Sequence, residues 1–188
     1  MVSLQKRLQN LDPQLGPKRN RKESFSLNDC LSLVVDAYRA KALRHDVSID
    51  LVFKPRRQSA LKTVKACVIQ VVQNLLENSF FWLTTKRRKF DTDQADRAID
   101  IVVLGRRGLL KISDNGPGIA PENKERIFKE FYTTRKSGGG RGLGLYIARE
   151  LLELYGGTIE LSDEIVNENG RLNTFIIDFS AMKDDSNE

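Results

Sequence analysis

The sequence predicts a two-layer α/β sandwich in which helices cover one mixed β-sheet. Strand-like segments cluster late in the chain, and segments with a helical apolar period are interspersed with them. These segments do not follow a regular βαβ alternation, and the motif GxxxxGK[ST] is absent from the sequence. Both observations disfavour a Rossmann or Walker P-loop fold.

Apolar residues that recur every three or four positions predict the helices. The strongest helix is expected over 60–84, and a second one over 27–44. A third helix is expected from Leu143 to Tyr155 and ends at Gly156-Gly157, as helix C-termini often do. A short helix or turn is expected over 127–131.

Alternating or short continuous apolar runs predict the strands. In the first of these runs the apolar residues fall on alternate positions from Val47 to Phe53, and Pro55 closes it. A turn at 105–108 separates two others. The expected strands are 47–53, 99–104, 109–113, 158–161 and 174–179.

Length and composition fit one globular domain with tails. The chain has 188 residues, of which 40% are hydrophobic and 30% are charged, which is enough for one sizeable core. We expect a linker over 1–24, the domain over 25–181 and a disordered tail over 182–188. No apolar run reaches the roughly 18 residues of a membrane span, and the start lacks a signal-peptide core. We therefore expect a cytoplasmic segment without direct membrane contact.

The formal net charge of +6 raises the question of a nucleic acid or an acidic partner. The basic clusters have no interleaved aromatic residues for base stacking, and no DNA-reading motif accompanies them. We expect solvated basic faces with some attraction for polyphosphate, and no nucleic acid partner. Cys30 and Cys67 lie in helical apolar patterns, which predicts buried, reduced thiols rather than a disulfide.

Three amides in the strongest expected helix are candidate metal ligands. Gln70, Asn74 and Asn78 are spaced four residues apart and therefore lie along one helix face. An amide oxygen is a hard, neutral ligand that suits Mg²⁺, which keeps several waters and takes one or two protein ligands. Taken alone, the same amides could equally cap or bridge neighbouring backbone.

A carboxylate beside glycines follows the strand expected over 109–113. In Asp114-Asn-Gly-Pro-Gly118, the strand delivers Asp114 to the end of the sheet, where its carboxylate can accept a hydrogen bond from an exocyclic amine. Gly116 and Gly118 let the backbone turn and approach a flat ring. A plain Asn-Gly-Pro-Gly turn is the alternative interpretation of this segment by itself.

A glycine-rich segment runs from Gly138 to Leu145 and opens directly into a helix. Backbone N–H groups at a helix N-terminus favour phosphate through hydrogen bonds and the helix dipole. Arg135, Lys136 and Arg141 add positive charge at the same place. A flexible linker is the alternative interpretation.

Taken together, in this order and spacing, these segments resemble the Bergerat-fold (GHKL) ATPase family, which includes DNA gyrase, Hsp90, MutL and the sensor histidine kinases. Residues 74–78 resemble its N box, 114–118 its G1 box, 127–135 its F box and 140–145 its G2 box. The resemblance extends from about Phe25 to Phe179 and implies the Bergerat fold with ATP and Mg²⁺ as cofactors.

The resemblance also implies a role for each matching residue. Asn78 would bind Mg²⁺, Asp114 the adenine amino group, and the glycine-rich segment the phosphates, while Thr174 helps to hold the adenine. The expected cofactor-binding residues are Asn78, Asp114, Gly116, Gly118, Gly140, Arg141, Gly142, Leu143, Gly144, Leu145 and Thr174. The expected catalytic residues are Asn74, Arg135 and Lys136.

One position separates the subfamilies. Hydrolysing members carry Glu four residues before the metal-binding Asn, where a carboxylate can orient or deprotonate a nucleophile. This chain has Asn74 there, as histidine kinases do, and an amide cannot act as a general base. The resemblance therefore implies phosphotransfer to a histidine, which needs little activation. Glu77 adjoins Asn78 in sequence and cannot share its face, so we interpret it as solvated or structural.

The chain departs from the histidine kinases at two places. Those kinases often carry a basic residue three positions after the metal-binding Asn, where this chain has Phe81. Phosphate neutralisation would then fall to Arg135, Lys136 or Arg141. The insertion at 85–98 is longer and more charged than usual, and it has no assigned role.

The sequence therefore predicts the ATP-binding catalytic domain of a sensor histidine kinase, which donates the γ-phosphate to a histidine on a separate helical domain. His45 lacks the proline that follows a typical acceptor and is expected to be a solvated helix-end residue. Residues 1–24 would then end a truncated helical dimerisation segment, and a response regulator would act downstream. The alternatives are a gyrase- or MORC-like nucleotide-gated clamp, which the basic charge suits, and a nucleotide-binding pseudokinase, which Phe81 favours.

Overall fold

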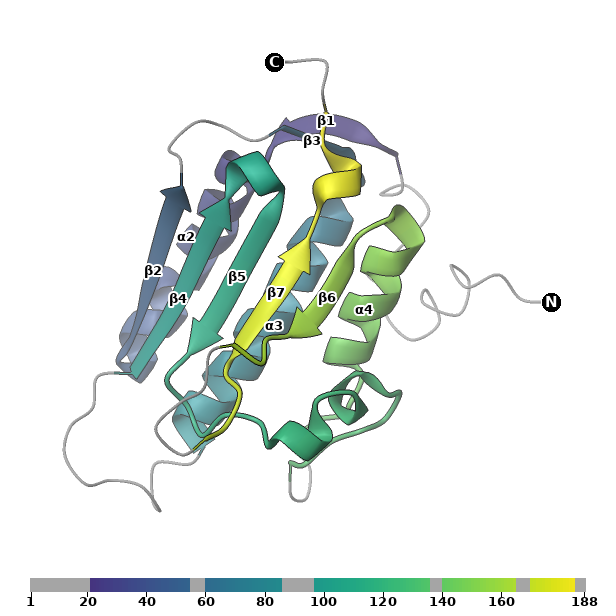
Figure 1. The fold of residues 1–188 in the computed structure, drawn as a ribbon. Coiled ribbons are helices and arrows are strands. Elements are labelled where there is room, and N and C mark those ends of the chain that lie inside the picture. Colours follow the sequence, from purple (N-terminus) through teal and green to yellow (C-terminus); the bar gives the residue numbers. More distant parts are fainter. Residues whose placement is uncertain (1–20, 55–59, 86–96, 136–139, 165–169, 185–188) are drawn as a thin grey trace.

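The structure, a computed structural model, describes residues 21–54, 60–85, 97–135, 140–164 and 170–184. A mixed five-stranded sheet forms one layer, and three α-helices form the other (Figure 1). The helices are α2 (Leu27–His45), α3 (Lys65–Thr85) and α4 (Gly144–Tyr155). The predicted two-layer α/β sandwich with a mixed sheet is confirmed.

The sheet has the strand order β2-β4-β5-β7-β6. Its strands are β2 (Val47–Lys54), β4 (Arg97–Leu104), β5 (Leu109–Asp114), β6 (Thr158–Leu161) and β7 (Thr174–Asp178). Strand β2 runs parallel to β4, and all other neighbours are antiparallel. The register aligns Ile101 with Ile112 and Ile112 with Phe175, and all three side chains are buried. This row of apolar side chains is typical of a sheet face that packs on helices.

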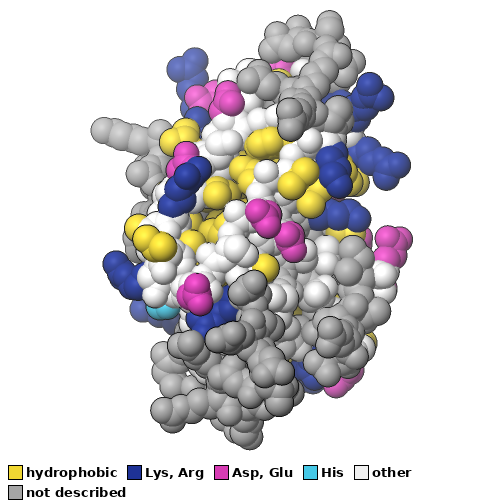
Figure 2. Space-filling model, turned by 90° about the vertical axis from the view of Figure 1, so that its left-hand side faces the viewer, with side chains coloured by type: hydrophobic (Ala, Val, Ile, Leu, Met, Phe, Trp, Pro, Cys, Tyr) yellow, Lys and Arg dark blue, Asp and Glu magenta, His cyan; other side chains and the backbone are white. Residues whose placement is uncertain are grey.

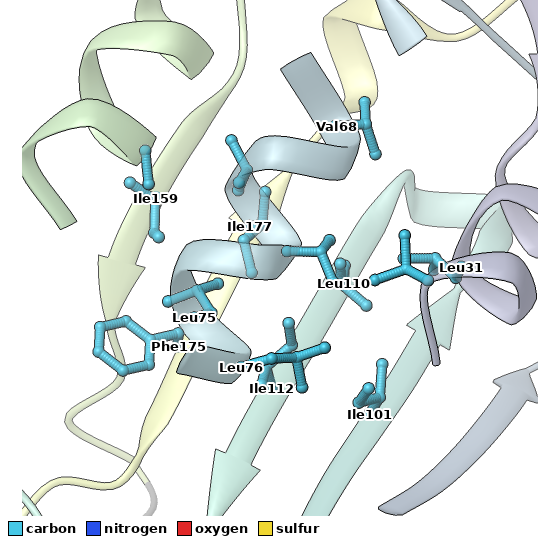
Figure 3. Close-up of a cluster of buried hydrophobic side chains, with 14 of the residues drawn as sticks. Leu31, Val68, Leu75, Leu76, Ile101, Leu110, Ile112, Ile159, Phe175 and Ile177 are labelled. Carbon is cyan, nitrogen blue, oxygen red and sulfur yellow. The ribbon is translucent and has the colours of Figure 1, made fainter. Parts of the chain in front are cut away.

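The core lies between this sheet face and the helices (Figure 3). Helix α3 crosses the middle of the sheet and buries Val68, Leu75 and Leu76 almost completely. Burying each such side chain stabilises the fold by about 1.5–3 kcal/mol. Helix α3 is thereby fixed against the sheet, and the polar residues on its remaining face are held in place with it.

Strand β2 forms one edge of the sheet. The side of the molecule on which β2 lies carries hydrophobic, basic and acidic side chains. Figure 2 shows hydrophobic side chains in the middle of this side, with lysine, arginine and acidic side chains spread around them. Val52 on β2 is 42% exposed. Among the residues described on this side, the basic side chains are interspersed with acidic ones, as expected for solvated faces.

Local sequence explains where two helices begin and end. The Ser26 hydroxyl accepts a hydrogen bond from the Asp29 N–H at 3.1 Å and caps the start of α2. Gly156 ends α4 in the left-handed conformation, with φ of 94°, which a residue without a Cβ adopts most easily. The end of α4 is therefore as predicted.

The predicted helix over 60–84 is wrong in its first residues. Ala60–Thr63 forms strand β3, which pairs antiparallel with β1 (Glu23–Ser26), and α3 begins only at Lys65. Phe25 faces Leu61 across this small sheet. Leu61 is fully buried, but an apolar residue at this position suits both a helical and an alternating pattern, so its periodicity could not separate the two.

The ends of the domain also differ from the expected boundaries. Strand β1 starts at Glu23, inside the expected linker, and Met182 is buried although it was expected to begin a disordered tail. The Asp184 N–H donates to the Ala60 carbonyl at 3.1 Å, which ties this end to β3. Residues 1–20, 86–96 and 185–188, which include most of the linker, insertion and tail, lie outside the described residues. No helix in the described ranges is both long and apolar enough to cross a membrane.

Candidate nucleotide-binding site

A cavity of about 500 Å³ opens where α3, the end of β5 and the start of α4 meet. This volume lies within the range of small-molecule sites in proteins. Predicted site residues that line it are Asn74, Asn78, Asp114, Gly118, Arg135, Gly140, Arg141, Gly142, Leu143, Gly144 and Leu145. Three segments far apart in sequence thus contribute to one cavity.

Asp114 is the last residue of β5 and carries a carboxylate in the cavity wall. The Ser79 hydroxyl donates to its Oδ2 at 2.7 Å, and the Gly116 N–H donates to its Oδ1 at 3.0 Å. Burial raises the pKa of Asp114, while these two hydrogen bonds oppose the shift by stabilising the ionised form. An ionised carboxylate accepts about four hydrogen bonds, so it keeps capacity for an amine of a ligand.

Helix α3 presents the amides of Asn74 and Asn78 to the cavity, whereas Gln70 does not line it. The Asn78 Oδ1 accepts a hydrogen bond from the Arg135 Nη2 at 3.2 Å. Within the described part of the chain, the buried Nδ2 of Asn74 has no hydrogen-bond partner. A buried amide donor without an acceptor is uncommon, and a polar ligand would satisfy it.

The glycine-rich segment brings backbone close to the cavity wall. Gly142 has φ of 67°, and a Cβ there would lie 2.6 Å from the Phe131 carbonyl carbon. Only glycine fits this position without a shift of backbone. Helix α4 then begins at Gly144, and Leu143 precedes it without a capping hydrogen bond from its side chain. The first N–H groups of α4 are therefore suited to bind an anionic group.

The comparison with known proteins agrees with this geometry. The family model described as "Histidine kinase-, DNA gyrase B-, and HSP90-like ATPase" matches residues 64–181. The chain belongs to this ATPase family. It is 33% identical over 132 residues to the sensor protein ChvG of Rhizobium meliloti (strain 1021), and the match covers 68% of this chain. It is 24% identical over 149 residues to sporulation kinase D of Bacillus subtilis (strain 168), and that match covers 79% of this chain.

Solved structures of histidine kinases share the fold. The catalytic domain of histidine kinase ThkA superposes with a TM-score of 0.64 at 24% identity, over 84% of this chain and 93% of that one. The mycobacterial sensor histidine kinase MprB also gives a TM-score of 0.64, at 18% identity, over 83% of this chain and 95% of that one. The chain spans only 21% of the length of ChvG and 28% of that of sporulation kinase D.

Membership of this ATPase family implies nucleotide binding, and most of the predicted site residues line the cavity. Gly116 is not in its lining but supports Asp114 through its N–H. Thr174 is buried in β7 and donates to the Asn173 Oδ1 at 3.1 Å, and both of its chain neighbours line the cavity. Lys136 lies outside the described residues.

The fold adds lining residues that the sequence analysis missed. They include Trp82, Ile119, Asn123, Arg171 and Phe175, and two residues of the F-box-like segment, Ile127 and Tyr132, also line the cavity. Trp82 follows Asn78 by one helical turn, so the same four-residue spacing that groups the amides also indicates Trp82. Arg171 gave no such signal, because its place depends on tertiary contacts, whereas Tyr132 lies in the 127–135 segment that resembles the F box. The Tyr132 hydroxyl donates to Asn123 at 2.9 Å, and the Arg171 Nε donates to the Gly118 carbonyl at 3.4 Å.

Glu77 lines the cavity and contacts two residues of helix α2. Its carboxylate accepts a hydrogen bond from the Tyr38 hydroxyl at 3.0 Å and pairs with the Lys41 ammonium at 2.7 Å. The Glu77 side chain is 56% exposed, so this ion pair adds little stability. The exposed, paired carboxylate fits a solvated or structural residue, but the expectation that Glu77 cannot share the face of Asn78 is wrong, since both line the cavity.

Proposed function

We propose that this chain binds Mg·ATP and donates the γ-phosphate to a histidine on a separate helical domain, as the catalytic domain of a two-component sensor histidine kinase. The observation that carries the proposal is one cavity that joins Asn78, Asp114 and the uncapped start of α4 at Gly144. Relatives named as a sensor protein and a sporulation kinase support the same function.

The base would bind at the Asp114 end of the cavity. There the carboxylate, held by Ser79 and Gly116, accepts a hydrogen bond from the adenine amino group. Burial makes this hydrogen bond stronger than one at the surface. Asp114 therefore acts in recognition of adenine.

The phosphates would bind at the start of α4, between the backbone of Gly142 to Leu145 and the side chains of Arg135 and Arg141. Asn78 in the cavity lining could supply a hard amide oxygen to Mg²⁺; in this structure the same Oδ1 accepts from the Arg135 Nη2 at 3.2 Å, a hydrogen bond that the metal would replace. Asn78 would hold the metal, which takes few protein ligands and neutralises charge on the phosphates when bound.

Catalysis would depend on positioning and charge neutralisation. Asn74 cannot remove a proton, but its buried Nδ2, which has no partner among the described residues, can donate a hydrogen bond to an oxygen of the bound nucleotide. Such placement is a large part of catalysis in phosphoryl transfer. Lys136 is a further candidate for neutralising phosphate charge.

The proposal implies two protein partners. A helical dimerisation and phosphoacceptor domain would supply the histidine, and a response regulator would receive the phosphate from it. Since ATP is a cytoplasmic substrate, the proposal places this domain in the cytoplasm.

Incubation with Mg²⁺, γ-labelled ATP and the helical acceptor domain of a sensor kinase tests the proposal. We expect acid-labile phosphate on the acceptor domain, lost with its histidine and with Asn78→Ala. Robust phosphate release without an acceptor, abolished by Asn78→Ala, would support a nucleotide-gated clamp instead. Nucleotide binding without transfer to any acceptor would support a pseudokinase.

A further inference from the structure

The Arg135 guanidinium stacks on an aromatic ring at the edge of the cavity. Its central carbon lies 3.7 Å from the centroid of the Phe81 ring. Phe81 follows Asn78 by three residues on α3, so the ring and the Asn78 amide lie on neighbouring parts of one helix face. The Nη2 of the same guanidinium donates to the Asn78 Oδ1 at 3.2 Å.

The absence of a side chain at Gly140 leaves space for the same guanidinium. A Cβ placed on Gly140 would lie 2.9 Å from the Arg135 Nη1, so a residue without a side chain leaves room for the guanidinium where it lies. The Phe81 ring itself packs edge-on against Trp82, with ring centroids 5.1 Å apart. The guanidinium therefore contacts a ring and an amide oxygen, and Gly140 leaves room for it.

Charge and burial strengthen this arrangement. Burial lowers the pKa of the Arg135 guanidinium, and the nearby Glu77 carboxylate opposes that shift. Arginine stays protonated in proteins, so a partly desolvated positive charge lies beside the amide oxygen of Asn78. Cation–π interactions gain strength when the cation loses water, and a planar guanidinium stacks better than an ammonium.

We propose that Phe81 is a positioning residue, whose ring holds the Arg135 guanidinium next to Asn78 so that it can neutralise phosphate charge on the bound nucleotide. This inference rests on the proposed function, because it assumes that phosphates bind at this end of the cavity. An apolar residue in the helix thus acts on an anionic ligand through the cation that it holds. The Phe81 ring needs no contact with the nucleotide.

The effect of Phe81 on ATP affinity should depend on Arg135. Phe81→Leu removes the ring and keeps an apolar side chain, and we expect ATP to bind about 2- to 30-fold more weakly, as for loss of one cation–π interaction. Adenosine, which lacks phosphates, should bind with unchanged affinity. Phe81→Tyr keeps the ring and should restore ATP affinity. In an Arg135→Ala background Phe81→Leu should have no further effect, because the pair is then already broken.

Calorimetry on these variants, with ATP and with adenosine, is the experiment. Phe25→Leu is the matched control, since Phe25 also lies under a cation, Lys65, but in the small β1–β3 sheet. An equal loss of ATP affinity from Phe81→Leu with and without Arg135 would overturn the inference, as would an equal loss for adenosine. Failure of the unmodified chain to bind ATP or adenosine at all would instead contradict the proposed function.

Discussion

Asp114→Asn is the substitution that separates adenine recognition from stability most sharply. The change is nearly isosteric, so the strand end keeps its shape. The amide oxygen of the introduced side chain can still accept from the Gly116 N–H, which lies 3.0 Å from Oδ1 of the aspartate. The amide nitrogen then replaces Oδ2, the oxygen that accepts from Ser79 at 2.7 Å. A donor consequently meets the adenine amino group, which is also a donor.

The expected loss of affinity follows from the charge on the lost acceptor. A hydrogen bond to a charged group contributes about 1.5–3 kcal/mol, which corresponds to about a 10- to 150-fold change in affinity. Because two donors face each other in the variant, we expect the upper part of this range. The affinities for ATP and for adenosine should fall by the same factor, since both ligands carry the amino group that Asp114 would bind.

Asp114→Asn should lower the ligand affinity without lowering the stability of the fold. Burial raises the pKa of Asp114 above its ordinary value of 3.8, which it has in the unfolded chain. The protonated carboxyl therefore contributes its full share to the free energy of unfolding at pH values below 3.8, and this contribution is lost as the pH rises through the folded-state pKa. Asparagine does not titrate, so at neutral pH the variant should unfold at an equal or higher temperature than the unmodified chain.

Thermal unfolding by circular dichroism, together with calorimetric titration of ATP and adenosine, measures both effects. Asp36→Asn is the matched control, because Asp36 is exposed on α2 and pairs with Arg39 of the same helix at 2.7 Å. A folded Asp114→Asn variant with unchanged affinity for both ligands would refute the role of this carboxylate in adenine recognition.

Three further predictions concern pH, the glycine-rich segment and the thiols. Nucleotide affinity should fall as the pH decreases through the raised pKa of Asp114, and calorimetry that found a constant affinity across that range would contradict its role as an acceptor. Gly142→Ala should lower the affinity for ATP more than that for adenosine in the same titrations, because its Cβ would lie 2.6 Å from backbone of the segment expected to bind phosphates. Gly144→Ala should lower the ATP affinity less, because the nearest atom to its Cβ would be 3.8 Å away. Burial raises the pKa of Cys30 to about 11 and that of Cys67 to about 12, so thiol reagents should label neither until the protein unfolds.

Much of the fold was predictable because its signals are local. The alternation in β2, the glycine at the end of α4 and the apolar period of α3 each occur within one segment of sequence. The start of α3 was not predictable, since β3 exists through its pairing with β1 and Leu61 fits either period. The buried Met182 was missed for a related reason, because polar neighbours follow it in sequence and its burial depends on the rest of the fold.

The candidate site likewise has residues that local sequence predicts and contacts that it does not. Asn78, Asp114 and Gly142 stand at element positions that spacing and turn chemistry indicate, and all three line the cavity. The stack of Arg135 on Phe81 joins residues that are far apart in sequence, so no local pattern could predict it. Sequence spacing thus indicates which residues face a ligand, whereas the contacts that hold them depend on tertiary structure.

An NMR titration of this chain with Mg·ATP tests the shared site most directly. The resonances of the Asn78 side chain, the Gly116 amide and the Gly142 amide report on the metal, base and phosphate ends of the cavity. We predict that all three shift along the titration with one dissociation constant. Shifts confined to other parts of the chain, or different dissociation constants at these three positions, would contradict a single ATP site.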